Sequence, residues 1–173
     1  MHNGASTWLV DIGNGSPFTT ALYVRDVSGL TVAPEIPPLE PRLDRVPGAD
    51  IDPADWTGWW AAIVATGPVP GRPRVAPTAG AALLNRYGRV ADWVGDWEDR
   101  ETRAVTVTGV SEVVSALEAA AGRPATFAYA VDVVPVAGPF HLDLTPTWLL
   151  IGTETAQRGG LGDLLAARLA PLV

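Results

Sequence analysis

Three tryptophans on one short predicted helix constrain this chain more than any other feature. The stretch from Asp52 to Gly67 predicts a helix, because Asp52 is a good N-cap residue and Gly67 is a typical helix end. Trp56 and Trp60 fall on one face of that helix, with Trp59 beside them. Such a face is either the centre of a hydrophobic core or the anchor of a binding surface, and the sequence leaves both readings open.

The remaining patterns predict a single α+β domain over residues 1–173, with a mostly antiparallel sheet and about four helices packed on it. Strands are expected over residues 7–11, 19–25, 30–33, 104–108, 126–136 and 147–153, and the first three would form a meander. Besides the tryptophan helix, helices are expected over 83–97, from 110 to a stop at Gly122, and over 161–172. Pro-rich connectors occupy 33–50 and 67–80. A split into two domains near residue 104 stays open.

Composition excludes several classes of chemistry. The 173 residues include no Cys, and all 12 basic residues are Arg, so thiol nucleophiles, Cys-based zinc sites and lysine chemistry are ruled out. The net charge is −7 and no segment is basic, which argues against nucleic acid and anionic membrane surfaces as partners. An acidic protein suits a basic protein partner. No cofactor and no metal site are expected.

The expected location is the cytoplasm. The first residues lack the charged start and apolar run of a signal peptide. No apolar run approaches the roughly 20 residues that a membrane helix needs. The sequence does not indicate an oligomeric state.

One stretch resembles a known phosphate-binding element. Residues 9–16 read Leu-Val-Asp-Ile-Gly-Asn-Gly-Ser, and this resembles the first phosphate-binding hairpin of the acetate kinase, hexokinase and actin superfamily. The resemblance implies that Asp11 orients a metal ion and that Gly13, Asn14 and Gly15 approach the phosphates. The same residues are also ordinary hairpin-turn residues, and the superfamily uses two such domains.

Other polar residues form smaller groups. Asp92, Asp96 and Asp99 are spaced four and three residues apart, which places them on one side of a helix, and a solvated acidic face is the preferred interpretation. His141 lies two residues before Asp143, which is the spacing of a base and its orienting group on one side of a strand, although no nucleophile accompanies them. Asp132 interrupts an apolar strand, and we expect it on the solvent side.

The preferred function is a non-enzymatic module that binds a protein partner, by analogy with small immunity proteins. Its favoured contacts are Trp59, Trp93, Asp92 and Asp96. One alternative is a small phosphotransferase-like or hydrolytic enzyme that uses Asp11, Asp132 or His141. Another alternative is a structural subunit of a larger bacterial assembly.

Overall fold

The computed structural model describes residues 6–48, 50–69, 89–101, 109–157 and 161–173. Within these ranges the helices are α1 (Ser16–Ser28), α2 (Pro53–Thr66), α4 (Val90–Glu101), α5 (Val110–Ala121), α6 (Thr153–Gln157) and α7 (Leu161–Leu169), which runs into the 3₁₀ turn η2 (Ala170–Leu172). The strands are β1 (Thr7–Gly13), β2 (Thr126–Val134), β3 (His141–Thr145) and β4 (Trp148–Gly152). The strand predicted over 104–108 and the first half of the helix predicted over 83–97 lie outside the described residues.

The four strands form one mixed sheet in the order β1-β2-β4-β3. β1, β2 and β4 are parallel to one another, and only β3 runs antiparallel, along β4. The fold class is therefore α+β, but the prediction of a mostly antiparallel sheet is wrong. Parallel neighbours need a long crossover connection, and here the chain between β1 and β2 supplies one that contains four of the described helices.

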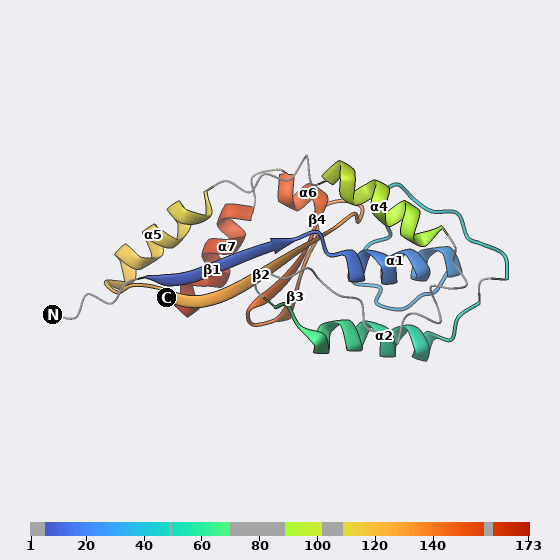
Figure 1. Ribbon diagram of the computed structural model, residues 1–173, viewed down its shortest axis with the longest axis horizontal. Helices are drawn as coiled ribbons and strands as arrows, with labels where there is room; N and C mark the ends of the chain where they lie inside the picture. Colours follow the sequence, from blue (N-terminus) through green and yellow to red (C-terminus); the bar gives the residue numbers. More distant parts are fainter. Residues whose placement is uncertain (1–5, 49, 70–88, 102–108, 158–160) are drawn as a thin grey trace.

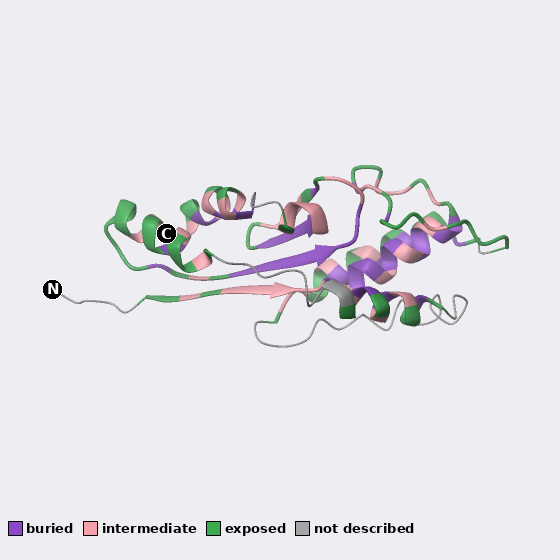
Figure 2. Ribbon diagram, turned by 90° about the horizontal axis from the view of Figure 1, so that it is seen from above, coloured by how far each residue is buried: buried purple, intermediate pink, exposed green. Residues whose placement is uncertain are grey.

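The two faces of the sheet carry separate hydrophobic cores. On β2, Ala130 and Val134 point to the core that α1, α2 and α4 cover, whereas Val131 and Val133 point to the core under α5 and α7. This division follows from the two-residue period of a strand. α5 and α7 lie together at one end of the molecule, and α1, α2 and α4 lie together at the other (Figure 1). β2 and β4 are mostly buried between these layers, while β1 is partly exposed along the edge (Figure 2).

The predicted meander does not exist, because the second strand of the meander is the helix α1. β1 instead pairs with β2, and Thr7 lies opposite Thr126. The chain enters α1 through Gly15, whose φ of 57° is left-handed and whose added Cβ would lie 2.6 Å from the Val133 carbonyl oxygen. α1 is buried on nearly all sides, so its apolar residues form no single helical stripe. Its β-branched residues then give the pattern of a strand.

The tryptophan helix is confirmed as α2, and it belongs to the core. Asp52 caps its start, since an Asp52 carboxylate oxygen accepts a hydrogen bond of 2.8 Å from the Ala54 N–H. Trp56 and Trp59 are buried, and the Trp56 indole N–H donates to the Ala21 carbonyl of α1 at 2.7 Å. This bond joins α2 to α1. The two readings of the tryptophan face are thereby resolved in favour of packing.

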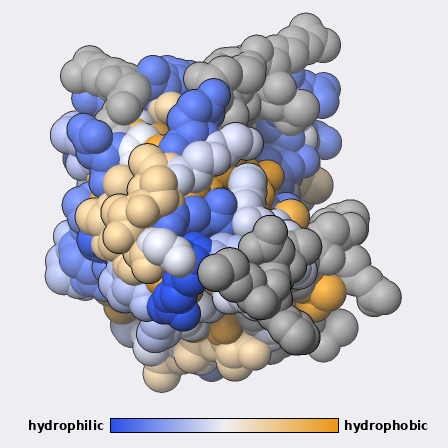
Figure 3. Space-filling view, turned by 90° about the vertical axis from the view of Figure 1, so that its left-hand side faces the viewer, coloured by the Kyte–Doolittle hydropathy of each residue, from blue (hydrophilic) through white to orange (hydrophobic). Residues whose placement is uncertain are grey.

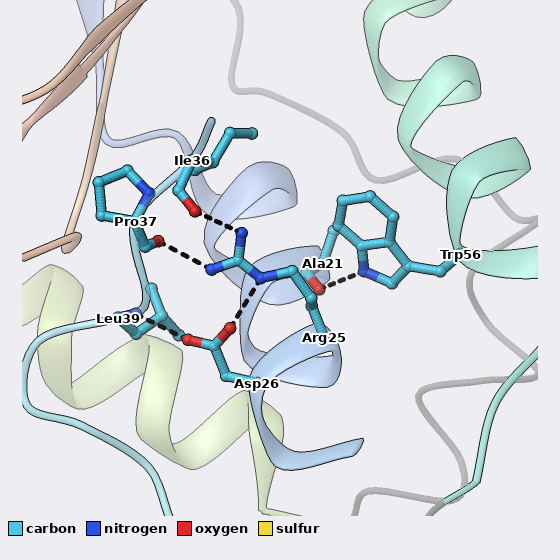
Figure 4. A network of polar contacts seen from close by, with 7 residues as sticks. All are labelled: Ala21, Arg25, Asp26, Ile36, Pro37, Leu39 and Trp56. Atoms are coloured by element: carbon cyan, nitrogen blue, oxygen red, sulfur yellow. Dashed lines mark hydrogen bonds and ion pairs between the residues drawn. The ribbon is translucent and has the colours of Figure 1, made fainter. Parts of the chain in front are cut away.

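An ion pair on α1 holds the Pro-rich segment that precedes α2 (Figure 4). The buried Arg25 guanidinium bonds the Asp26 carboxylate at 2.7 Å and donates to the Ile36 and Pro37 carbonyls, each at 2.8 Å. The second Asp26 oxygen accepts from the Leu39 N–H at 2.7 Å. We call these contacts the Arg25–Asp26 clamp. The segment lacks regular structure, so side chains satisfy backbone groups that a helix or sheet would otherwise pair.

Candidate functional site

The outer face of α4 carries three carboxylates. Asp92, Asp96 and Asp99 are all exposed, and their spacing of four and three residues places them on one side of the helix. Val94 and Trp97, on the other side, are buried. We call Asp92, Asp96 and Asp99 the acidic strip. All three side chains are accessible to solvent, and none of them forms an ion pair with another residue of the described part of the chain.

A half-buried aromatic pair borders the acidic strip. Trp93 lies next to Asp92 in the sequence and packs on Tyr23 of α1, with ring centroids 5.4 Å apart. Both rings are partly exposed. Trp93 therefore fixes α4 on α1 and also presents part of its ring to solvent beside the carboxylates. An aromatic surface of this kind, held rigid by its own packing, is typical of residues that anchor a protein interface.

Trp59 does not belong to this surface. Its side chain is only 1% exposed and it packs in the core on the α1 side of the sheet. The structure therefore does not place Trp59, one of the predicted partner contacts, at the surface, because α2 turns two of its three tryptophans inward. Of the four predicted contact residues, the structure places Trp93, Asp92 and Asp96 together on α4.

The residues of the enzymatic alternative do not form one site. Asp11 and Asp132 lie on the same face of neighbouring strands, since Asp11 pairs with Ala130 and Gly13 pairs with Asp132. His141 lies on the edge strand β3, where it pairs with Ile151 and so belongs to the opposite face. The sheet thus separates His141 from both carboxylates.

Asp132 is buried, contrary to the expectation that it faces solvent. Its side chain is 0% exposed, and the Trp148 indole N–H donates to it at 2.7 Å. Ala128 and Ala130 share its side of β2, and small residues there favour a solvent face in the sequence. In the structure the small side chain of Ala130 instead leaves room for the large Trp148 of β4, which lies opposite it.

The turn after β1 is closed by a side chain from α4. The Ser16 hydroxyl hydrogen-bonds the Glu98 carboxylate, and it also bonds the Asn14 side chain at 3.0 Å. Glu98 thus lies at the N-terminus of α1, where the helix dipole favours a negative charge. This contact, between residues 82 positions apart, leaves no mark in the local sequence pattern. Because a helix follows the turn, the resemblance to a phosphate-binding hairpin does not extend to the structure.

Comparisons with known proteins identify no relative. No family model, no curated protein and no solved structure matches this chain. Among the described residues, no helix is long and apolar enough to cross a membrane. Nor do the acidic and histidine side chains of this part of the protein form a group of three or more that could hold a metal ion.

Proposed function

We propose that this chain is a binding module for a basic protein partner, and that the acidic strip of α4 with Trp93 is its contact surface. The observation that carries this proposal is the exposure of three carboxylates on one helix face, beside an aromatic ring that is itself held in place. The net charge of −7 supports it, because long-range attraction would steer a basic partner toward the chain.

The geometry favours recognition over catalysis. The acidic strip lies on the solvent face of a helix whose other side packs on α1, so its spacing is rigid while its charges stay hydrated. Hydrated carboxylates are suited to pairing with Arg or Lys at the rim of an interface, where they set orientation and association rate. Trp93 would supply the apolar contact that a rim of charges lacks.

A capture experiment with charge-matched variants tests this proposal. The full chain, the triple variant D92N/D96N/D99N and a control triple variant E35Q/E40Q/D44N serve as baits in lysate of the source cells, with mass spectrometry as readout. The control neutralises three carboxylates that are also exposed but lie in the Pro-rich segment. We expect one stoichiometric basic partner that the wild type and the control retain and the α4 variant loses by at least about tenfold.

Two results would overturn the proposal. The first is equal retention of the partner by both triple variants, which would show that the acidic strip is not the contact surface. The second is the absence of any stoichiometric partner for a wild-type bait that is folded by circular dichroism. Dependence on salt gives a further check, because binding through exposed charges weakens as ionic strength rises.

A further inference from the structure

A hollow between β3 and α7 lies away from the acidic strip. Its volume is about 540 Å³, and the β3–β4 turn forms one wall while the end of α7 and η2 form the other. The lining includes Asp143, Leu144, Pro146, Ala167, Arg168 and Leu172. We call it the β3–α7 hollow. Its volume falls within the range of pockets that hold small organic ligands. Figure 3 views the molecule from the end at which α5 lies, where apolar side chains are interspersed with hydrophilic ones on the surface.

A single ion pair crosses the largely apolar lining. The Arg168 Nε donates to an Asp143 carboxylate oxygen at 2.8 Å, and both side chains are partly exposed. This bond uses one edge of the guanidinium. The two terminal nitrogens of Arg168 have no hydrogen-bond partner among the described residues, although a guanidinium presents its donors as a planar fork. Asp143 therefore orients Arg168 and leaves donors available to another acceptor.

A buried hydroxyl lies close to the same pair. Tyr129 of β2 is 2% exposed, and its hydroxyl has no hydrogen-bond partner within the described structure. The pKa of Tyr129 is raised to about 12, mainly by burial and also by the Asp143 charge, while the Arg168 charge opposes the rise. A buried hydroxyl without a partner is rare in native structures, because it loses its hydration without compensation. Both charges of the ion pair therefore act on Tyr129, although Tyr129 does not itself line the hollow.

We propose that the β3–α7 hollow binds a small carboxylic acid with an apolar body. The carboxylate would accept from the terminal nitrogens of Arg168, which match its two oxygens in geometry. The apolar body would lie against Leu144, Pro146 and Leu172. The Thr145 hydroxyl, which accepts from the Thr147 N–H at 3.3 Å, still has a proton to donate at the same wall.

A matched set of probes tests this assignment. Ligand-observed NMR and calorimetry compare 4-phenylbutyrate, 4-phenylbutanol and 4-phenylbutylamine, which share one apolar body, on the full chain at low salt and millimolar ligand. We expect the acid to bind at least about tenfold more tightly than the alcohol or the amine, as a charge-assisted pair with Arg168 requires.

Two variants and one control separate the roles of the lining. Arg168→Gln should remove the preference for the acid over the alcohol, and Ala167→Trp should abolish binding of all three by filling the hollow. Arg123→Gln, which removes an exposed charge at another place, should change nothing. No binding of the acid to the folded wild type would overturn the proposal. Equal affinity for acid and amine, or an unchanged preference in Arg168→Gln, would also overturn it.

Discussion

Replacement of Arg25 by Met should destabilise the protein strongly, although arginine is a residue type that usually lies at the surface. The Arg25 and Asp26 side chains are 5% and 12% exposed, so the clamp that they form is almost dry. Met keeps the length of the aliphatic stem but removes every donor. The Asp26 carboxylate then loses its counter-ion and keeps only the Leu39 N–H, and the Ile36 and Pro37 carbonyls lose their donor.

The size of the effect follows from what is left behind. Removal of one member of a buried ion pair costs about 3–5 kcal/mol, because the other charge stays buried without compensation. We expect this loss in the free energy of unfolding of Arg25→Met. Arg45→Met is the matched control, since Arg45 pairs with Asp50 at 3.7 Å but the two side chains are 66% and 86% exposed. The control should change stability by less than about 0.5 kcal/mol.

Urea unfolding followed by tryptophan fluorescence and circular dichroism measures both variants. The free energy of unfolding of the double variant R25M/D26N should fall by less than the sum of the two single losses, with a difference of at least about 1 kcal/mol. The reason is that position 26 then carries no buried charge that needs a partner. A loss below about 1 kcal/mol for Arg25→Met, or additive losses in the double variant, would refute the argument that the clamp is a coupled buried network.

Two further predictions concern backbone strain and alkaline pH. Gly15→Ala should lower stability by about 1–3 kcal/mol, because φ is positive there and the new Cβ would lie 2.6 Å from the Val133 carbonyl oxygen. Gly58→Ala, in open space within α2, should raise stability by about 0.5–1 kcal/mol. The urea midpoints of both variants measure these changes. Tyr129 has a folded pKa of about 12 against an ordinary value of 10.0, so the unfolded chain releases its proton first and stability falls as the pH rises from the ordinary pKa to the folded one. In Tyr129→Phe this fall should be smaller, and an identical pH profile would show that Tyr129 is not the group involved.

Local signals predict those elements whose boundaries and faces are marked in the chain itself. The cap at Asp52 and the stop at Gly67 define α2 correctly, and the spacing of Asp92, Asp96 and Asp99 places them correctly on one exposed side of α4. These features depend on contacts within one or two turns. A single sequence carries such information directly.

Features that depend on distant partners cannot be predicted in this way. The sequence of α1 has the pattern of a strand because its neighbours cover the helix on nearly all sides, which removes the helical stripe. The expectation that Asp132 faces solvent is wrong because the Trp148 indole N–H donates to it in the core. No local pattern around Asp132 predicts this donor, which lies 16 positions away. No local pattern marks Arg168 as a ligand-binding residue, since its partner Asp143 lies 25 positions away and neither belongs to a recognisable motif.

The parallel pairing of β1 with β2 has a consequence for how the chain reaches its native state. β1 ends at Gly13, but the strand beside it begins only at Thr126, after α1, α2, α4 and α5. During synthesis, β1 must therefore wait for most of the chain to emerge before its backbone groups find their partners. Contacts between residues so distant in sequence require the loss of much chain entropy before any favourable interaction forms, and this slows folding. We therefore expect folding to be limited by the docking of the first strand rather than by the formation of its helices.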